Sequence, residues 1–285
     1  MEILALCATY NRRDITLAAL GSLKEQALPV GVRMQIAVVD DASTDGTPEA
    51  IRKNFPDVSI IGTSGGFFWA GAMRFGFKKF WDPQKYTDLL VFNDDVILYN
   101  NAIYELINTA RYSENSCGGT IVVGAMKDPE TRKITYGGLI KKPYRPSIYL
   151  ERVSPTGNVQ SVDTLNMNLA LIDKNCLSQN EFIRAGFTHS LADYDFGLRA
   201  KKKGARLLLA PEFMGECSRN QANGTWEDSS LPFIRRFSLI WHPKGLPPYP
   251  RILYLRAHTP LIWPAIFIWP YLKLIFSHFF RIIKK

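Results

Sequence analysis

The feature that most constrains the fold is a regular alternation of short apolar runs with helix-like segments over the first third of the chain. Apolar runs of strand length stand at Ile3–Ala8, Met34–Val39, Val58–Gly62 and Asp88–Phe92. Strands that alternate with helices at such intervals form parallel sheets covered by helices. The sequence therefore predicts an α/β fold with a mixed, mainly parallel sheet.

The segments between and after these strands carry helix signals. The sequence predicts helices at Asp14–Leu28, Glu49–Phe55 and Leu191–Gly204, a helix that runs through Phe80 after the glycine-rich loop Gly65–Gly71, and a late strand at Arg206–Ala210. The middle of the chain, roughly Cys117–Ile172, has shorter apolar runs between Gly and Pro residues. This pattern indicates a mixed or antiparallel extension of the sheet.

Composition narrows the class of protein. With 46% hydrophobic and 21% charged residues in 285, the chain can bury a large core and is not globally disordered. A formal charge of +9 favours anionic partners, such as nucleic acid, acidic lipid headgroups or a phosphorylated substrate. The cysteines Cys7, Cys117, Cys176 and Cys217 form no CxxC pair, which argues against a zinc site or a disulfide framework. Because the N-terminus also lacks the basic region of a signal peptide, we expect a cytoplasmic protein.

The tail differs from the rest of the chain. After Pro250 it is dense in Trp, Phe, Ile and Leu, but prolines at 260, 264 and 270 and the charges of Lys273 and Arg281 interrupt the apolar run. A membrane-spanning helix needs about 20 nearly uninterrupted apolar residues. We expect amphipathic helices lying in a membrane interface, with Trp263 and Trp269 in the apolar layer and Lys273 and Arg281 on phosphate headgroups. A helix packed on the protein's own core and a re-entrant or spanning segment are the alternatives.

Polar residues follow the expected strands at the point where each ends. Thr9–Tyr10–Asn11 follow the first strand, Asp40–Asp41 the second, and Asn93–Asp94–Asp95 the fourth. In open α/β sheets, ligands bind at the carboxyl ends of the strands. Any one of these clusters can instead cap a turn, but three on separate strands indicate a binding site.

Three chemical tasks match these residues if the ligand is a nucleotide sugar. Asp40 and Asp41 can accept hydrogen bonds from a base and a ribose, and Asn93–Asp95 supplies the hard oxygen ligands that Mg²⁺ or Mn²⁺ requires. The third task, removal of a proton from an acceptor hydroxyl, needs a general base. Asp193 and Asp195 are the candidates, with helix N-capping as the alternative role for one of them.

Two further groups have open roles. In the Gly65–Gly71 loop, Gly65 and Gly66 permit close approach of the backbone to a ligand. The aromatic residues Phe67, Phe68 and Trp69 either stack on a sugar or fill the core. His189 either positions an acceptor or packs.

In this order and spacing, the motifs resemble the family 2 glycosyltransferases of the GT-A (Rossmann-like) fold. The resemblance covers roughly residues 1–226 and rests on CysAlaThrTyrAsnArg, ValValAspAspAlaSerThrAspGlyThr, GlyGlyPhePheTrpAlaGlyAlaMetArg, AsnAspAsp and AspTyrAspPheGlyLeuArg. The third of these is similar to the glycine-rich loop of rhamnosyltransferase-like members, and AsnAspAsp stands where the family has its metal motif.

The resemblance implies an inverting, single-displacement transfer from a nucleotide diphosphate sugar, assisted by Mn²⁺ or Mg²⁺. It implies that Asp95 is the main metal ligand, that Asp94 holds ribose or metal, and that Asp193 is the base. The donor would be bound by Thr9, Tyr10, Asn11, Arg12, Asp40, Asp41, Gly65, Gly66, Trp69, Arg74, Asn93 and Asp94, and the acceptor by Asn166, His189 and Arg199. Arg74 and Arg199 are placed by charge, as partners of a diphosphate or of neighbouring carboxylates.

The chain departs from the family pattern at several points. Ala192 stands where many members have Glu before the base, which leaves open whether Asp193 or Asp195 acts. Residues 216–224 contain no His, where some relatives supply a further metal ligand. A Gln-x-x-Arg-Trp motif is absent, which favours the addition of one sugar or a few over polymerisation.

We expect a catalytic domain at residues 1–226, with a donor half at about 1–115 and an acceptor half at 116–226, followed by a membrane-association region at 227–285. The expected function is transfer of rhamnose (from dTDP-rhamnose) or a UDP-hexose sugar to a lipid-linked saccharide at the inner face of the cell membrane, for cell-surface polysaccharide. Alternatives are a sugar-phosphate nucleotidyltransferase, which would need a glycine-rich loop in place of ThrTyrAsnArgArgAsp, and a non-catalytic basic protein that binds membrane or nucleic acid. No nucleic-acid partner is expected, because the aromatic residues cluster in the apolar tail. A non-catalytic membrane protein is disfavoured because all three carboxylate clusters are present.

Overall fold

The structure is a computed structural model that describes residues 1–111, 117–143, 145–146, 148–219 and 224–283, with side chains as far as Phe276. Its strands are β1 (Glu2–Thr9), β2 (Arg33–Asp40), β3 (Ser59–Gly62), β4 (Asp88–Phe92), β5 (Ile97–Leu98), β6 (Thr120–Lys127), β7 (Ile134–Tyr136), β8 (Gly138–Lys141), β9 (Leu150–Arg152), β10 (Gln160–Ser161), β11 (Thr164–Leu165), β12 (Leu169–Asp173) and β13 (Arg206–Glu216). Its helices are α1 (Arg13–Lys24), α2 (Thr47–Asn54), α3 (Phe68–Phe80), α4 (Ala102–Arg111), α5 (Lys174–Gln179), α6 (Ala192–Lys202), α7 (Phe233–Ile240), α8 (Pro248–His258) and α9 (Trp263–Ile283).

The main sheet follows the strand order β10-β13-β6-β12-β4-β1-β2-β3. β1 runs parallel to β2 and β4, β2 runs parallel to β3, and β6 runs parallel to β13. β12 is antiparallel to both β4 and β6 and joins the two parallel groups. The predicted mixed, mainly parallel sheet is confirmed, and a small sheet of β11, β8 and β9 extends the second half.

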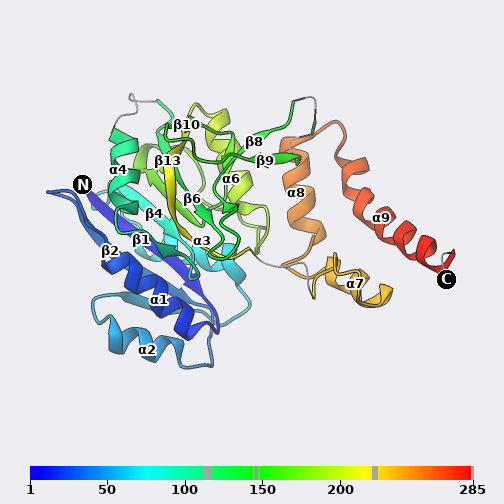
Figure 1. The fold of residues 1–285 in the computed structure, drawn as a ribbon, viewed down its shortest axis with the longest axis horizontal. Helices are drawn as coiled ribbons and strands as arrows, with labels where there is room; N and C mark the ends of the chain where they lie inside the picture. The colour runs from blue at the N-terminus through cyan, green and yellow to red at the C-terminus, as the bar shows by residue number, and fades with distance from the viewer. Residues whose placement is uncertain (112–116, 144, 147, 220–223, 284–285) are drawn as a thin grey trace.

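Helices cover both faces of the main sheet, so the molecule has three layers (Figure 1). Successive residues of a strand point to opposite faces, and β1 follows this rule. Leu4 and Leu6 join a core made with α3, α5, α6 and α8. Ile3, Ala5 and Cys7 join a second core made with α1, α2 and α4. All five side chains are fully buried, so β1 is held from both sides and fixes the edge at which the polar residues follow.

Three element boundaries differ from the predictions by more than two residues. α1 ends at Lys24 instead of Leu28, because the Gln26 side chain donates to the carbonyls of Ser22 and Tyr99 and ties the chain to the β5–α4 turn. α3 begins at Phe68, inside the predicted loop. β13 extends past Ala210 to Glu216, because it continues to pair with β6 beyond an irregularity in register and also pairs with β5.

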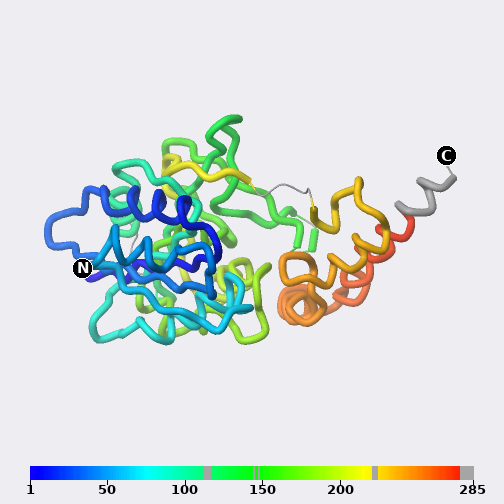
Figure 2. The backbone as a smooth tube through the Cα atoms, turned by 90° about the horizontal axis from the view of Figure 1, so that it is seen from below, coloured from blue at the N-terminus to red at the C-terminus, as the bar shows by residue number. Residues whose placement is uncertain are grey.

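The C-terminal helices lie to one side of the sheet, and α9 runs away from it toward the C-terminus (Figures 1 and 2). α8 packs on the part of the chain that forms the main sheet, with Tyr254 and Leu255 buried in the first core. Trp263 also packs against that core, whereas Trp269 is 56% exposed. Lys273 is exposed, and Arg281 lies beyond the described side chains. In the described residues, no helix combines the length and the apolarity that crossing a membrane requires.

Candidate active site

The carboxyl ends of β1, β2 and β4 meet at one edge of the sheet, because these strands are parallel neighbours. Thr9 lies opposite Asp40 in the register of β1 and β2. The segment Asn93–Asp95 follows β4 directly, and Tyr10, 56% exposed, follows β1. The polar clusters that the sequence singles out therefore share the edge at which α/β folds bind ligands.

Asp40 and Asn11 connect the first two loops of this edge. The backbone N–H of Asn11 donates to Ser43 Oγ at 2.8 Å. The side-chain Oδ1 of Asn11 accepts from the backbone N–H of Thr44 at 2.7 Å. Asp40 is buried, and its Oδ2 accepts from the Ser43 amide at 3.0 Å. Among the described residues, Asp40 Oδ1 has no hydrogen-bond partner. A buried acceptor without a partner is costly, which makes Asp40 a candidate for contact with a ligand.

Asp41, which was predicted like Asp40 to contact the nucleoside, is buried and hydrogen-bonded to the loop before α3. Its Oδ1 accepts from Thr63 Oγ1 at 2.5 Å and from the Phe67 amide at 3.1 Å, and its Oδ2 accepts from the Phe68 amide at 2.8 Å. The carboxylate thus accepts hydrogen bonds from the first amides of α3, and its negative charge interacts favourably with the positive end of the helix dipole. Gly65, at φ +85°, completes the turn that brings these amides round. Asp41 therefore stabilises the loop between β3 and α3 by accepting hydrogen bonds from it.

The remaining donor-side predictions fall on the same loop. Gly66 has φ +77°, and no atom lies within 4 Å of where its Cβ would stand, so the backbone is open on that side. Trp69 is partly buried against the core, and its Nε1 donates to Asn93 Oδ1 at 2.9 Å. This bond ties the start of α3 to the segment that carries Asp94 and Asp95.

Arg12 holds the two carboxylates after β4. Its Nη1 lies 2.9 Å from Asp94 Oδ1 and 3.0 Å from Asp95 Oδ2. Burial raises the pKa of Asp94 to about 6; Arg12 opposes this shift, and the charge of Asp95 adds to it. The Cys217 thiol lies 3.5 Å from Asp95 Oδ1. At this edge, the carboxylates of Asp94 and Asp95 therefore converge on the guanidinium group of Arg12.

The donor set at this point suits a hard divalent ion. Asp94 and Asp95 direct oxygens at a common position, and Mg²⁺ is often held by one or two carboxylates together with substrate phosphates. Over the described ranges, no group of three or more His, Cys, Asp or Glu side chains is arranged to hold a metal. The pair therefore fits an ion whose coordination a diphosphate would complete, and Arg12 is the group that such an ion would displace.

Asp193, in the first turn of α6, is partly exposed and hydrogen-bonded by neutral groups. Its Oδ2 lies 3.3 Å from Asn166 Nδ2, and its Oδ1 accepts from the Tyr194 amide at 2.9 Å. Burial raises the pKa of Asp193 to about 6, against the effect of these hydrogen bonds. No ion pair between described residues includes this carboxyl group. Of the predicted acceptor residues, Asn166 is thus placed beside the candidate base.

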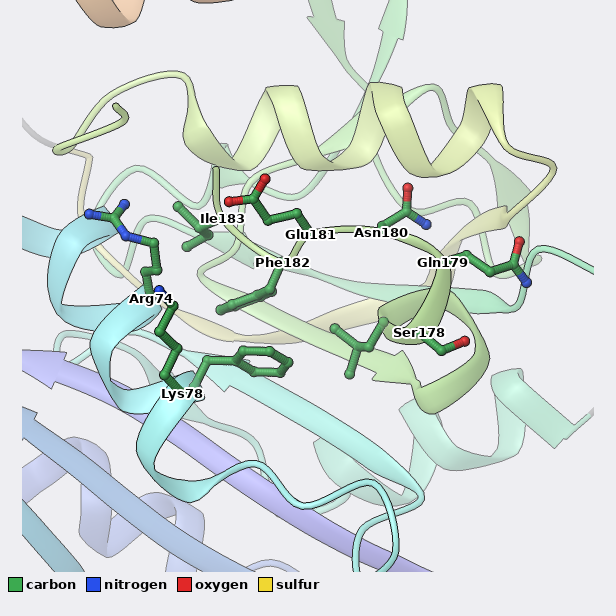
Figure 3. A pocket seen from close by; sticks show the side chains of 10 residues that line it. Arg74, Lys78, Ser178, Gln179, Asn180, Glu181, Phe182 and Ile183 are labelled. Carbon is green, nitrogen blue, oxygen red and sulfur yellow. The ribbon is translucent and has the colours of Figure 1, made fainter. Parts of the chain in front are cut away.

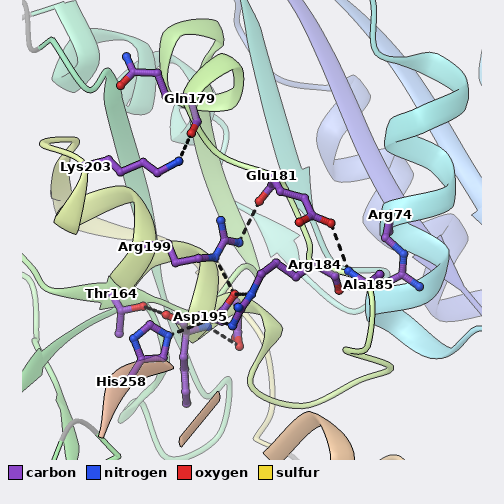
Figure 4. Close-up of polar contacts among 12 residues, drawn as sticks. Arg74, Thr164, Gln179, Glu181, Arg184, Ala185, Asp195, Arg199, Lys203 and His258 are labelled. Carbon is purple, nitrogen blue, oxygen red and sulfur yellow. Dashed lines mark hydrogen bonds and ion pairs between the residues drawn. The ribbon is translucent and has the colours of Figure 1, made fainter. Parts of the chain in front are cut away.

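Asp195, two residues later, has no exposed surface and is surrounded by cations (Figure 4). Arg184 binds it through two nitrogens, Nε at 2.9 Å and Nη2 at 2.5 Å, and Arg199 Nε lies 2.8 Å from its Oδ2. His258 Nε2 lies 2.9 Å from its Oδ1. Despite burial, these hydrogen bonds and charges lower the pKa of Asp195. Both of its oxygens are committed to protein groups. Arg199 was predicted to contact the acceptor, a diphosphate or a neighbouring carboxylate, and it contacts the carboxylate of Asp195.

Arg74 also binds the protein itself. Its Nη1 donates to the carbonyl oxygens of Arg184 at 3.3 Å and Phe187 at 3.1 Å. The residue borders a pocket of about 330 Å³ between α3 and residues 177–183 (Figure 3). The carboxylates of the strand edge do not line this pocket.

The structure brings two tail residues, which sequence analysis missed, to the candidate site. The His242 ring lies 5.8 Å from that of Phe68, whose ring is also 6.5 Å from His189. Burial, followed by the positive charges of Lys244, Arg12 and His242, lowers the pKa of His189 to about 4. Lys244 and Arg12 therefore lie near enough to His189 to act on its ring, and such a cationic environment suits an anionic ligand. Since His242 and Lys244 lie in the tail, no local motif marks them.

Comparison with known proteins agrees with this geometry. The family model for glycosyl transferase family 2 matches residues 6–168. A search of curated proteins found no match.

Three solved structures with a similar fold are distant from this chain in sequence. The mannosyltransferase PcManGT from Pyrobaculum calidifontis, in complex with GDP-Man and Mn²⁺, is 17% identical with a TM-score of 0.56, over 92% of this chain and 67% of that one. S. aureus TarS 1–349 in complex with UDP-GlcNAc is 15% identical with a TM-score of 0.57, over 89% and 70%. GalNAc-T7 with UDP, GalNAc and Mn²⁺ is 12% identical with a TM-score of 0.62, over 81% of this chain and 52% of that one. These likenesses show the GT-A fold, and the family match, which spans more than half of the chain, shows that the protein belongs to glycosyl transferase family 2.

Proposed function

We propose that this glycosyltransferase inverts the anomeric configuration of the sugar it transfers, with Asp193 as the general base. The observation that carries the proposal is the contrast within α6 between Asp193 and Asp195. A base needs a pKa near the working pH and an oxygen free to receive a proton. Burial raises the pKa of Asp193 to about 6 and its hydrogen-bond partners Asn166 and the Tyr194 amide are neutral, whereas Asp195 is fully committed to two arginines and a histidine.

The proposed step is a single displacement. The acceptor hydroxyl oxygen bonds to the anomeric carbon while the bond from that carbon to the diphosphate oxygen breaks. The hydroxyl proton moves to Asp193, and the bonding electron pair leaves on the diphosphate. Asn166, 3.3 Å from Asp193 Oδ2, holds the carboxylate in place for this transfer. Attack on the face opposite the leaving group inverts the configuration.

The donor would lie along the strand edge. Asp40, whose Oδ1 lacks a partner among the described residues, and the backbone around Asn11 are proposed to contact the nucleoside. Asp94 and Asp95 would hold Mn²⁺ or Mg²⁺, which neutralises charge on the departing diphosphate. Arg12, released from the carboxylates, would then be free to bind phosphate oxygens. A UDP-hexose or dTDP-rhamnose is the proposed donor, by analogy within the family.

The acceptor is proposed to be lipid-linked, because the net positive charge of the chain lies entirely in its tail. Residues 229–285 hold nine of the 35 Lys and Arg residues and none of the 26 Asp and Glu residues. The preceding 228 residues therefore carry 26 charges of each sign, and the formal +9 belongs to the tail. An anionic lipid surface attracts such a segment, whereas a second copy of the tail would repel it.

An exposed apolar stripe on α9 supports the same partner. Ile268, Trp269, Leu272 and Phe276 are 48%, 56%, 38% and 53% exposed, and their spacing places them on one face of the helix. Lys273 is exposed beside them. An apolar stripe flanked by cations is the pattern of helices that lie in the membrane interface. We propose attachment at the inner face of the cell membrane and a role in making cell-surface polysaccharide, one or a few sugars at a time.

The test is release of nucleoside diphosphate from UDP-, dTDP- and GDP-sugars with Mn²⁺, by the wild type and by Asp193→Asn. We expect one nucleotide class to be consumed and the variant to be slower by about 10²–10⁴-fold, the usual contribution of a general base. Asp14→Asn is the matched control, because that carboxylate is 81% exposed on α1. Wild-type turnover by Asp193→Asn, or no consumption of any donor, would contradict the proposal.

A further inference from the structure

The C-terminal helix α8 is attached directly to the helix that carries Asp193. His258, the last residue of α8, places Nε2 2.9 Å from Asp195 Oδ1 (Figure 4). Its ring is stacked at a tilt on Tyr254, 4.8 Å away, and Tyr254 has no exposed surface. Burial raises the pKa of Tyr254, and the charges of Tyr194, Asp193 and Asp195 add to the shift. The α8 residues Tyr254 and His258 therefore lie close to Asp193 and Asp195.

Gly186 allows close packing of its loop against α8. Gly186 has φ +102°, and a Cβ at this position would lie 2.6 Å from the Tyr249 ring and 3.3 Å from Leu253 Cδ2. Tyr249 and Leu253 are four residues apart on α8 and share one face, and Tyr254 and His258 are related in the same way. The segment that contains Gly186 also supplies Arg184, the bidentate partner of Asp195. The loop that contains Gly186 thus approaches α8 closely at Tyr249 and Leu253.

The hydrogen bond from His258 must run to Asp195 as donor. Because the pKa of Asp195 is lowered by its surroundings, the carboxylate carries no proton and Nε2 must carry it. Without His258, Oδ1 would keep Arg184 as its partner and Oδ2 would keep Arg184 and Arg199. The charge of Asp195 would remain compensated, so the loss would affect geometry more than net charge.

Displacement of Asp195 is transmitted to Asp193 through Tyr194. The Tyr194 amide donates to Asp193 Oδ1 at 2.9 Å, and its carbonyl accepts from Thr164 Oγ1 at 2.9 Å. Its hydroxyl lies 3.3 Å from Asn166 Nδ2, the group that also contacts Asp193. Both the backbone and the side chain of Tyr194 therefore connect the buried cluster to the base.

We propose that His258 is a positioning residue: by holding α8 on Asp195, it sets the first turn of α6 and the orientation of Asp193. The proposal rests on the proposed role of Asp193 as base. It joins the tail, which carries the net charge, to the reacting carboxylate through one helix. Docking of α8 is thereby a condition for full activity, although α8 supplies no group to the substrates.

The experiment compares His258→Ala, His258→Gln and the control Ala257→Ser in the full-length protein. Ala257 is an exposed neighbour on the same helix. With the donor found to be consumed, we expect His258→Ala to lower kcat by about 10- to 100-fold, because small misplacement of a reacting group has effects of this size. KM for the donor should stay unchanged, since His258 bonds to Asp195 on α6 and the proposed donor residues follow β1, β2 and β4. His258→Gln should recover most of kcat, because its amide N–H reaches a similar position.

Hydrogen exchange of the α6 amides supplies a readout that does not depend on turnover. Faster exchange at residues 192–196 in His258→Ala, restored in His258→Gln, is the expected result. Exchange equal to the wild type would overturn the proposal whatever the kinetics, and so would faster exchange with an unchanged kcat. If the wild type consumes no nucleotide sugar, the proposed function fails, and the exchange data still decide whether His258 holds α6.

Discussion

Replacing the two carboxylates of α6 one at a time should separate stability from activity. Asp195→Asn removes the charge that Arg184 and Arg199 share, in a side chain with no exposed surface. Asp193→Asn removes a partly exposed carboxylate that has no ion-pair partner among the described residues. The same isosteric change, two residues apart, thus acts on a buried ion-pair cluster in one variant and on a partly exposed carboxylate in the other.

The expected magnitudes follow from burial. Breaking a buried ion pair from one side costs about 3–5 kcal/mol. Because the Arg184 and Arg199 side chains keep 23% and 16% of their exposure, solvent compensates in part and about 3 kcal/mol is expected. An unfolding entropy of about 2.1 cal/mol/K per residue gives about 0.6 kcal/mol/K for 285 residues. Asp195→Asn should therefore lower Tm by about 5 °C.

Asp193→Asn should leave Tm unchanged or raise it. Its folded pKa of about 6 exceeds the model-compound value of 3.8, so folding disfavours the charged form at neutral pH. Removing that charge relieves the penalty. Turnover, by contrast, should fall about 10²–10⁴-fold.

The assay is thermal unfolding of both variants together with diphosphate release from the best donor. Asp14→Asn, with its carboxylate 81% exposed, should match the wild type in both measurements. The reasoning is refuted if Asp193→Asn destabilises the fold more than Asp195→Asn does. It is also refuted if folded Asp195→Asn loses turnover while Asp193→Asn retains it.

Further outcomes follow from the same contacts. Since protonated Asp193 cannot accept a proton, kcat should fall as pH decreases through about 6; a flat profile from pH 5 to 8 would exclude it as base. Arg12→Ala should free the carboxylates that Arg12 bridges, so less Mn²⁺ should saturate turnover; an increased Mn²⁺ requirement would show that Arg12 supports the metal site. Asp41→Ala should unfold at a lower temperature by about 2–5 °C through loss of its loop hydrogen bonds, and an unchanged Tm would contradict that role. Trp269→Ser should weaken sedimentation with vesicles of anionic lipid but not alter hydrolysis of the donor, and undiminished sedimentation would place the membrane contact elsewhere.

Much of the fold was predictable because local pattern and tertiary structure agree in the first half of the chain. β4 was predicted at its observed bounds, Asp88–Phe92, since a buried strand reads as one continuous apolar run. The end of α1 was not, because Gln26 bonds to Tyr99, more than 70 residues away in sequence. The start of α3 depends in the same way on Asp41. Boundaries set by distant partners leave no local signal.

In the candidate site, too, features set by local sequence were predictable, and features set by distant partners were not. The strand-end clusters could be placed together because parallel strands end at a common edge. The sequence left the choice between Asp193 and Asp195 open, because nothing local shows that His258 lies 2.9 Å from Asp195. His242 and Lys244 were missed for the same reason. Their approach to Phe68 and His189 depends on the path of the tail.

The most direct test of the account is thermal stability of the wild type and Asp95→Asn against UDP-, dTDP- and GDP-sugars, with and without Mn²⁺. A ligand at 100 times its Kd stabilises the folded state by about 2.7 kcal/mol. For a chain of 285 residues this raises Tm by about 4–5 °C. The account predicts that one nucleotide class gives this shift with Mn²⁺ in the wild type and loses it in Asp95→Asn. No shift with any nucleotide sugar, in the presence or absence of metal, would contradict the claim that this edge of the sheet binds the donor.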